Sequence, residues 1–479
     1  MGGTQGQANV LADSTVHSIP FQEVKFHPHS FADPGGRFFQ WRGQFYRGIS
    51  STWAPFHRQL FQSGTISNLV GQGFLVGSEL TDFTLGAYPM VVRHHSVPFA
   101  SYPQEWCPAM FKDAVLAIVD LAYELAQHNL TLKDAHPWNL LVNACKPVYV
   151  DLGSIAPMDG VSVWPAYAEF CNYCLYPLLL MSQGHDRIAR LLVCEDGGVL
   201  KSELFRLAPL VLPSYLEWSV RRMIPYIKNR LFLQAQQVSV GGLPNPFDAN
   251  KSLLRSFLKN LRRQVESINL SSFDLEPGGS KDEAGWVLED SAVRTVKQER
   301  ISQILAQYRP ASVLDTNCGD GWFSLQAALS GSQVVAFDPD LARVTSLYRE
   351  ASKRDLTILP LYMDFAKPTP ARGLGSNSSI DAADRFQCDL VLALDLMDHL
   401  TRGQRIRLDQ IIDGLSQFTR RWLVLEYFPP EDGTHEGPGS GKPAAYTLEE
   451  CISLLESRFR SVTKLSSHPE DPVLLFCEK

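Results

Sequence analysis

Acidic residues and glycines in one short stretch have the types and spacing needed to bind a nucleoside. The segment VLDTNCGDGWFS has an apolar run ending at Asp315 and then a turn containing Gly319 and Gly321, and the nearby segment VVAFDPD has a second apolar run ending at Asp338. Glycines let the backbone turn tightly and approach a ligand, and an acid after the second strand suits ribose hydroxyls. The stretch therefore predicts the first βαβ unit of a nucleoside-binding α/β domain.

The spacing of this turn is not that of a dinucleotide site, which places three glycines around a pyrophosphate. Here the order is Asp-x-x-x-Gly-x-Gly, with Asp320 inside the turn. An acid in that place repels a diphosphate but tolerates a cationic sulfonium. The pattern resembles motif I of class I S-adenosylmethionine-dependent methyltransferases, with Asn317 where that family usually has its first glycine. A domain of the same fold without a ligand is the alternative.

The resemblance implies a set of residues that bind S-adenosylmethionine at the carboxyl ends of successive strands. Asp315 would orient the turn or meet the methionine ammonium, Asp338 would accept bonds from the ribose hydroxyls, and Asp364 would receive the adenine amino group. Each acid could instead cap a helix. No metal is implied in this part of the chain. The expected cofactor residues are Asp315, Asn317, Gly319, Gly321, Asp338, Asp364 and Asp395.

Candidate catalytic residues follow the fourth and fifth expected strands. The segment LALDLMDHL contains Asp395, Asp398 and His399, and RWLVLEYF contains Glu426. As a general base, His399 would take a proton from a hydroxyl or amine while the methyl group arrives; the alternative is a histidine bonded to nearby backbone. Glu426 is a further candidate for holding the acceptor. Because methyl transfer is an in-line displacement, positioning supplies much of the rate and a strong base is often unnecessary.

A second constellation lies earlier, in LKDAHPWNLLVNACKPVYVDLGS. Asp134 is followed five residues later by Asn139, and an apolar strand then ends at Asp151. The spacing resembles the catalytic loop and metal-binding segment of protein kinases and small-molecule phosphotransferases. The resemblance implies that Asp134 accepts a hydroxyl proton while Asn139 and Asp151 hold magnesium with ATP. The expected lysine of the nucleotide-gripping strand is missing, and Arg93 is the nearest cation. This half could therefore be a kinase-like domain that lacks part of the nucleotide-binding lobe but still binds nucleotide, or only a scaffold.

The hydrophobic pattern predicts an α/β protein in two parts. Strands and helices alternate beyond residue 286 and close with two strands, which predicts a parallel α/β sheet ending in a hairpin. This order resembles the Rossmann-like class I methyltransferase domain, and the resemblance implies a seven-stranded mixed sheet. An α+β kinase-like domain precedes it, with β-like runs at FFQWRGQFYRGIS, GQGFLVGSEL and YPMVVRHH and a helix over residues 108–128. The expected boundaries are a weakly ordered N-terminus over 1–38, the kinase-like domain over 39–273, a linker over 274–285 and the methyltransferase domain over 286–479.

Composition indicates which partners and which cellular compartment to expect. The chain has 479 residues, a net charge of -7 and nine cysteines scattered through apolar segments. The acidic balance does not favour nucleic acid as a partner. Scattered cysteines favour reduced thiols, and the pair Cys171 and Cys174 is expected on a buried helix face rather than on zinc. Without a signal peptide or an apolar run of membrane-spanning length, a cytoplasmic location is expected. The oligomeric state is left open.

The strings SYPQEW, LKDAHPWN, PVYVDLGS, MDFAKPTPARG and RWLVLEYF together resemble a bacterial group of two-part methyltransferases related to a nodulation protein. The resemblance implies methyl transfer to an oxygen or nitrogen atom of a small metabolite, a saccharide or a carrier-bound acceptor. Two alternatives stay open: a phosphotransferase that uses ATP and magnesium in the N-terminal half, and a non-catalytic nucleotide-binding protein.

Overall fold

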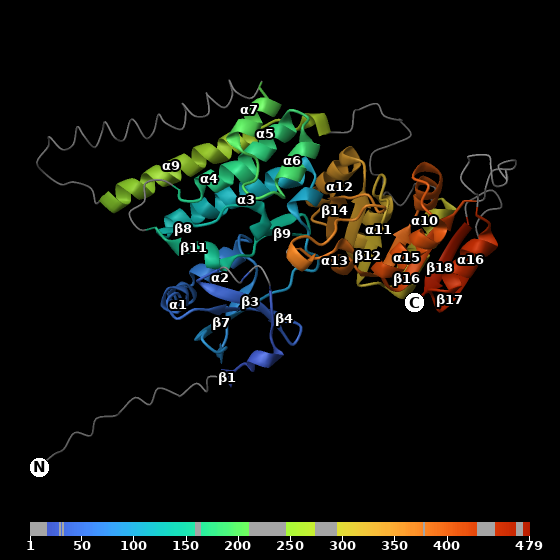
Figure 1. Cartoon of the computed structure of the whole chain (residues 1–479), viewed down its shortest axis with the longest axis horizontal. Coiled ribbons are helices and arrows are strands. Elements are labelled where there is room, and N and C mark those ends of the chain that lie inside the picture. Colours follow the sequence, from blue (N-terminus) through green and yellow to red (C-terminus); the bar gives the residue numbers. More distant parts are fainter. Residues whose placement is uncertain are drawn as a thin grey trace, which may run out of the picture. The chain divides into compact units, whose positions relative to one another are not determined.

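The computed structural model describes residues 17–27, 30, 33–158, 164–209, 246–273, 295–376, 379–428, 446–465 and 473–479. The chain divides into two compact units, with the boundary between Ser96 and Val97. The expected linker over 274–285 lies outside the described residues, and the domain boundaries expected from the sequence stay predictions. Figure 1 shows the elements of each unit.

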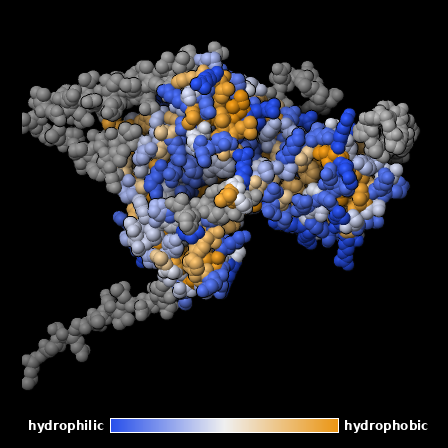
Figure 2. Space-filling view, in the orientation of Figure 1, coloured by the Kyte–Doolittle hydropathy of each residue, from blue (hydrophilic) through white to orange (hydrophobic). Residues whose placement is uncertain are grey.

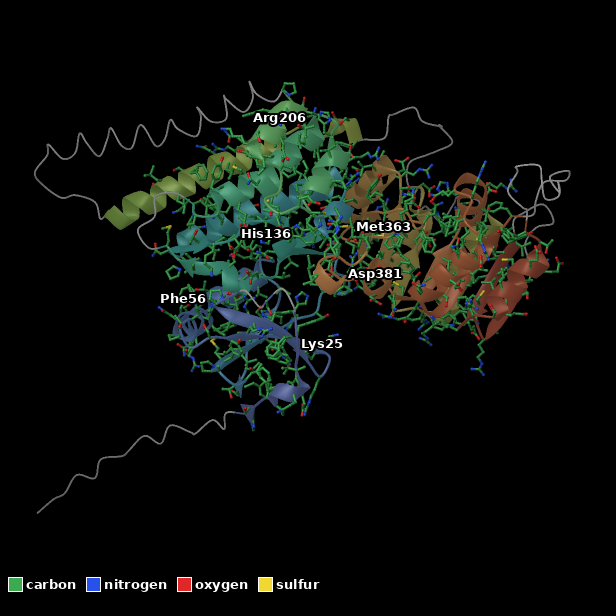
Figure 3. All side chains as sticks on the ribbon, in the orientation of Figure 1. Lys25, Phe56, His136, Arg206, Met363 and Asp381 are labelled. Atoms are coloured by element: carbon green, nitrogen blue, oxygen red, sulfur yellow. The ribbon has the colours of Figure 1, made fainter. Side chains whose placement is uncertain are left out.

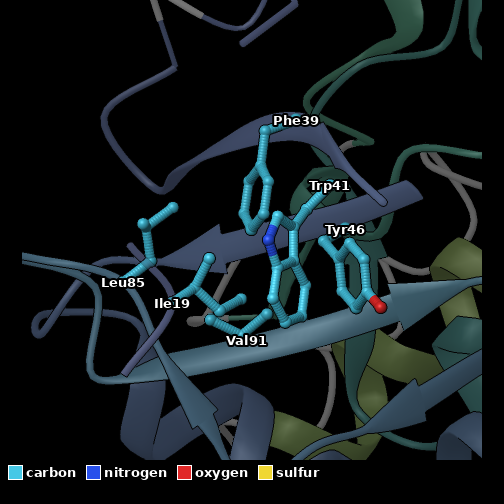
Figure 4. Packing of buried hydrophobic residues seen from close by; sticks show 6 residues of the cluster. All are labelled: Ile19, Phe39, Trp41, Tyr46, Leu85 and Val91. Atoms are coloured by element: carbon cyan, nitrogen blue, oxygen red, sulfur yellow. The ribbon is translucent and has the colours of Figure 1, made fainter. Parts of the chain in front are cut away.

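The first unit is built on a five-stranded antiparallel sheet in the order β2-β3-β4-β7-β5. The same unit also contains a short parallel pair formed by β1 and β6. Aromatic and branched side chains alternate along these strands, so one face is buried; Phe39, Trp41 and Tyr46 belong to its core cluster, shown in Figure 4. The strands are β1 (His17–Ser18), β2 (Lys25–Phe26), β3 (Gly36–Trp41), β4 (Gln44–Ile49), β5 (Ser78–Leu80), β6 (Phe83–Thr84) and β7 (Met90–His94).

Two helices, α1 (Ala54–Gln62) and α2 (Thr65–Gly71), separate β4 from β5. The expectation of a β-like run over GQGFLVGSEL is therefore wrong in its first half, since Gly71 ends α2 and the strand begins only at Ser78. Alternation of small and apolar residues over so few positions does not separate a helix end from a strand. The strands expected in FFQWRGQFYRGIS and YPMVVRHH are confirmed as β3, β4 and β7.

The second unit begins with a helical part built around α3 (Pro108–Gln127), whose apolar residues recur at helical spacing and are buried. Helix α9 (Pro246–Ser267) packs along α3. Two antiparallel pairs follow α3: β8 (Leu130–Leu132) with β11 (Ile155–Pro157), and β9 (Leu140–Asn143) with β10 (Lys146–Tyr149). The remaining helices are α4 (Tyr167–Phe170), α5 (Tyr176–Ser182), α6 (Asp186–Leu192) and α7 (Lys201–Leu207).

The cysteine predictions are consistent with this part of the structure. Cys171 and Cys174 are buried in a π-helical turn, Cys171–Leu175, between α4 and α5. All nine cysteines of the chain are free thiols. Among the described residues, no group of three His, Cys, Asp or Glu side chains could hold a metal ion.

The C-terminal part of the second unit is a seven-stranded sheet in the order β14-β13-β12-β15-β16-β18-β17. The pairs among β12 to β16 are parallel, and β18 is antiparallel to both β16 and β17. The parallel strands are apolar runs with both faces buried, as a sheet covered by helices requires. The strands are β12 (Ser312–Asp315), β13 (Gln333–Asp338), β14 (Ile358–Tyr362), β15 (Cys388–Ala393), β16 (Thr419–Tyr427), β17 (Ser461–Leu465) and β18 (Val473–Glu478).

Helices connect the parallel strands and begin at residues that the sequence marks. Asp340 caps α12 by accepting bonds from the backbone N–H groups of Ala342 and Arg343, and Thr447 opens α16 with a capping box. The surface of this part is mostly hydrophilic in the view of Figure 2. The helices are α10 (Val296–Tyr308), α11 (Trp322–Leu329), α12 (Leu341–Lys353), α13 (Ala382–Arg385), α14 (Leu396–Asp398), α15 (Leu408–Phe418) and α16 (Leu448–Glu456).

Within the second unit, the helical part contacts the edge strand β14. The Cys145 thiol donates to the carbonyl oxygen of Ile358 at 3.1 Å, and the guanidinium of Arg190 lies 4.0 Å from the ring centre of Tyr362. An unpaired edge strand can associate with strands of other molecules, so these contacts protect β14.

No helix within the described ranges has the length and apolarity to cross a bilayer.

Candidate functional site

The parallel strands bring the predicted acids to one edge of the sheet. Asp315 and Asp338 are the last residues of β12 and β13, Asp364 and Asp395 follow β14 and β15 by two positions, and Glu426 is next to last in β16. Because the carboxyl ends of parallel strands meet at one edge, these acids lie on the same side of the domain. Met363, the buried neighbour of Asp364, is labelled in Figure 3.

The turn after β12 is fixed by its own side chains and by glycine geometry. Asp315 is buried and its Oδ2 accepts a bond from the Ser324 hydroxyl at 2.7 Å. Burial raises the pKa of Asp315 to about 7, and the bond from Ser324 opposes that shift. Gly319 and Gly321 have φ values of 55° and 82°, which other residues adopt only at a cost. A Cβ on Gly321 would also lie 2.7 Å from Cδ1 of Leu347.

Asp338 is tied to the same turn. One carboxylate oxygen accepts a bond from the backbone N–H of Gly319 at 2.9 Å, and the other accepts from Asp340 N–H at 2.7 Å. Burial raises the pKa of Asp338, while these two backbone donors lower it. The remaining lone pairs of a carboxylate can still accept bonds. This geometry holds the glycine turn against the end of β13, next to the position expected for ribose.

The two polar side chains of the turn have defined partners. Asn317 Nδ2 lies 3.5 Å from the carbonyl oxygen of Asp395, and Asp320 Oδ1 accepts a bond from Trp322 N–H at 3.2 Å. Asp320 therefore forms a local turn at the start of α11. Asn317 connects the turn after β12 to the residue that follows β15.

A glutamine joins two predicted site residues across the third and fourth strand ends. Gln404 Nε2 lies 3.1 Å from Asp364 Oδ2 and 3.1 Å from Nε2 of His399. Since an amide nitrogen only donates, His399 accepts through Nε2 and carries its proton on Nδ1. His399 is exposed and lies at the start of a π-helical turn, His399–Gly403. Asp398, beside it, pairs with Arg402 at 2.8 Å.

Lys297 is a residue of this edge that the sequence analysis did not identify. Its Nζ lies 3.1 Å from Asp395 Oδ2 and 3.0 Å from Glu426 Oε1. Burial lowers the pKa of Lys297, but the charges of Glu426 and Asp395 outweigh it and raise that pKa overall. Burial raises the pKa of Glu426, and Lys297 opposes this. A lysine in the first turn after the capping residue Thr295 was the available signal.

No protein-family model matches the chain. The chain is 24% identical over 451 residues to the nodulation protein NoeA of Rhizobium meliloti (strain 1021), which covers 91% of this chain and 92% of that protein. Magnesium protoporphyrin IX methyltransferase (ChlM) from Synechocystis PCC 6803, solved with bound SAM, is 16% identical with a TM-score of 0.28, over 40% of this chain and 86% of its own. The bifunctional kinase-methyltransferase WbdD is 17% identical with a TM-score of 0.28, over 40% of each chain. Such likenesses between solved structures concern the fold and not the reaction.

The order and direction of the strands decide the fold of the C-terminal part. In order of appearance the strands lie as third, second, first, fourth, fifth, seventh and sixth, and the seventh is antiparallel to its neighbours. The C-terminal domain has the class I methyltransferase fold. We refer to the residues from α10 to the end of the chain as the methyltransferase-fold domain. The expected seven-stranded mixed sheet with a closing hairpin is confirmed.

The residues at the strand ends of the methyltransferase-fold domain fit a sulfonium cofactor. The glycine turn gives a backbone free of side chains, and the side of Gly319 where a Cβ would stand has no atom closer than 3.7 Å. Carboxylates at the strand ends suit ribose hydroxyls, an ammonium and a positively charged sulfur. The roles of the individual residues stay predictions.

The kinase-like constellation belongs to the helical part of the second unit. Asn139 Nδ2 donates to the Tyr149 hydroxyl at 3.1 Å, and that hydroxyl donates to the carbonyl oxygen of Asp134 at 3.0 Å. Asp134 N–H donates to the Ser154 hydroxyl at 3.0 Å, and Asp151 Oδ1 accepts from Gly153 N–H at 3.1 Å. The antiparallel pairs β8 with β11 and β9 with β10 thus bring together the segments that carry these three predicted residues.

Arg93 is the cation nearest in the sequence to the place of the missing lysine. Arg93 is exposed on β7 and pairs with Glu79. The buried cation of that sheet is Arg47 on β4, which pairs with Asp33 and is 9% exposed. Both strands are interior to the sheet, but Arg47 lies opposite Val92 and Arg93 opposite Tyr46, so the two arginines are on opposite faces.

Proposed function

We propose that the chain transfers a methyl group from S-adenosylmethionine to an oxygen or nitrogen atom of a small metabolite, a saccharide or a carrier-bound acceptor. The observation that carries this proposal is the meeting of acids and a glycine turn at one edge of the seven-stranded sheet, from Asp315 to Glu426. The similarity to NoeA extends over nine-tenths of both chains, so it includes residues before the methyltransferase-fold domain as well as that domain.

The cofactor supplies an electrophilic methyl group, whose bond to sulfur breaks, with the electron pair left on sulfur, as the bond to the acceptor forms. The chain's own residues position the partners for this in-line displacement. Asp338 would accept bonds from the ribose, Asp364 from the adenine amino group, and Asp395 from the methionine ammonium or the acceptor. The acceptor's proton would leave to Nε2 of His399, in place of the bond from Gln404, or to solvent.

Calorimetry with S-adenosylmethionine tests the cofactor assignment. We expect heat of binding with the natural chain and a loss of at least about tenfold in affinity for Asp338→Ala, since two ribose bonds to a charged group are removed. The control is Asp355→Asn, an exposed acid (68% exposed) after α12 and before β14, at the opposite edge of the sheet. Equal heats, or no heat, in the natural chain and Asp338→Ala would contradict the proposal.

Transfer of a labelled methyl group tests the acceptor class. The compounds tested carry hydroxyl or amine groups and belong to three classes: free metabolites, saccharides and carrier-bound compounds. Incorporation of the label separates substrates from non-substrates. We expect label on one of these classes and none on nucleic acid. Label on nucleic acid alone would overturn this part of the proposal.

A phosphotransferase is the second candidate. The observation that favours it is the linkage of Asn139 to the backbone carbonyl of Asp134 through the Tyr149 hydroxyl, with Asp151 just after β10 at the start of the 3-10 turn Leu152–Ser154. In this function Asp134 would accept a hydroxyl proton while Asn139 and Asp151 hold magnesium. Magnesium-dependent ATP turnover that disappears in Asp151→Ala would support it, whereas turnover unchanged by that substitution would exclude this site.

A further inference from the structure

Lys297 occupies a place in its helix that is unfavourable for a lysine by itself. Thr295 Oγ1 accepts a bond from Gln298 N–H at 3.2 Å, and Gln298 Oε1 accepts from Thr295 N–H at 2.9 Å. This capping box fixes the start of α10 and puts Lys297 in its first turn. The N-terminal end of a helix is electropositive and disfavours cations. The carboxylates of Asp395 and Glu426, which pair with Lys297, therefore stabilise a lysine at this position.

Glu426 depends on this lysine. Its side chain is 0% exposed, and Lys297 Nζ lies 3.0 Å from Oε1 and 3.1 Å from Oε2. A buried carboxylate without a cation is strongly destabilised and takes up a proton instead. Lys297 thus maintains Glu426 as an anion inside the sheet edge.

Glu426 in turn holds the backbone of Asp395. Its Oε2 accepts a bond from Asp395 N–H at 2.8 Å. Asp395 has a φ of 52°, in the left-handed region that residues with a Cβ occupy less readily than glycine. The side chain of Asp395 is 59% exposed, in contrast to that of Glu426. Of the two acids, Asp395 is the one that can reach a ligand.

We propose that Lys297 and Glu426 are positioning residues for the methyl transfer. Glu426 holds the backbone of Asp395 in its left-handed conformation, and Lys297, which pairs with Glu426 and with Oδ2 of Asp395, orients the exposed Asp395 carboxylate toward the cofactor. This inference rests on the proposed function. It also changes the role expected for Glu426 from the sequence: Glu426 does not hold the acceptor, because its side chain has no exposed surface and its Oε2 accepts bonds from both Lys297 and the backbone of Asp395.

Substitutions at Lys297 separate this role from a structural one. Lys297→Met keeps the length of the side chain and removes the charge, and Lys297→Arg keeps the charge. The matched control is Lys146→Met, which removes an exposed lysine from its pair with Asp355, where both side chains are more than two-thirds exposed (69% and 68%). Each variant is measured by calorimetry with S-adenosylmethionine and by the NMR chemical shift of a ¹³C-labelled methyl group on the bound cofactor.

We expect Lys297→Met to bind S-adenosylmethionine about tenfold more weakly, the equivalent of one bond to a charged group, and to shift the methyl signal. Lys297→Arg should restore both measurements, and Lys146→Met should change neither. If Lys297→Met has the affinity and methyl shift of the natural chain, the positioning role is wrong while the proposed function stands. If the natural chain itself binds no cofactor, the proposed function fails first.

A second variant covers the case in which Lys297→Met does not fold. The double substitution Lys297→Met with Glu426→Gln removes both members of the pair and leaves no uncompensated buried charge, since the Asp395 carboxylate that also loses Lys297 is exposed to water. We expect this double variant to fold, to bind the cofactor about tenfold more weakly and to show the altered methyl shift. Cofactor binding and a methyl shift equal to those of the natural chain would overturn the inference.

Discussion

Arg385 and Glu105 lie 280 residues apart in the sequence and form a buried ion pair, with side chains that are 2% and 1% exposed. Arg385 Nη1 lies 3.0 Å from Glu105 Oε2 and donates to the carbonyl oxygen of Ala100 at 2.6 Å. The guanidinium also lies 4.0 Å from the ring centre of Tyr102 and 4.4 Å from that of Phe386. The helical part of the second unit and the methyltransferase-fold domain therefore share a fully desolvated contact.

Removing one member of this pair should destabilise the second unit strongly. In Arg385→Met the Glu105 carboxylate stays buried without a cation, so we expect the free energy of unfolding to fall by about 3–5 kcal/mol. Urea unfolding measures this change. Lys146→Met, at an exposed pair, should cost less than about 1 kcal/mol. Similar small losses in both variants would mean that the Glu105 carboxylate is not held in a desolvated contact.

Replacement of Gly321 should impair both stability and cofactor binding. Gly321→Ala introduces a Cβ at a φ of 82° and 2.7 Å from Leu347 Cδ1. Gly331→Ala is the matched control, because its φ is 92° but no atom lies within 4 Å of the new Cβ. We expect a loss of about 1 kcal/mol in the control and at least about 2 kcal/mol for Gly321→Ala, measured by thermal unfolding. Only Gly321→Ala should weaken S-adenosylmethionine binding; equal effects of both variants would contradict the packing argument.

Asp315 should make stability depend on pH in one window. Burial raises its pKa from 3.8 to about 7 in the folded chain. Below pH 3.8 the carboxyl is protonated in both states and contributes no pH dependence. Between that value and about 7 the unfolded chain releases the proton and the folded chain keeps it, so the free energy of unfolding falls as pH rises and then levels off.

Asp315→Asn removes this titration while its side-chain oxygen can still accept the bond from Ser324. The free energy of unfolding, measured in urea from about pH 4 to about pH 8, should fall less steeply with rising pH in Asp315→Asn than in the natural chain. The advantage of the variant should therefore grow up to about pH 7 and then stay constant. Parallel curves for the two proteins over the whole range would show that Asp315 does not titrate there.

Gln404 should support the adenine end of the cofactor site. Gln404→Leu removes the donor that lies 3.1 Å from Asp364 Oδ2 and frees that carboxylate to turn. We expect S-adenosylmethionine affinity to fall by about three- to tenfold, with a change in thermal stability below about 1 kcal/mol because the bond is only partly buried. Gln410→Leu, an exposed glutamine on α15, is the control. Unchanged affinity in Gln404→Leu would argue against a cofactor role for Asp364.

Local patterns were sufficient to predict much of this molecule. The helix expected over residues 108–128 is α3 (Pro108–Gln127), because its apolar residues recur at helical spacing within a few positions of one another. The pattern failed over Gly71–Gly77, where the run is too short to distinguish a helix end from a strand.

The acids at the strand ends could be predicted from the order of residues alone, since alternating strands and helices of this kind make a parallel sheet and a parallel sheet gathers its carboxyl ends at one edge. The contacts of these acids could not be predicted in the same way. Lys297 reaches Glu426 across 129 residues and Gln404 reaches Asp364 across 40. Such contacts depend on how helices settle on the sheet and where their side chains point, and neither leaves a periodic trace in the chain.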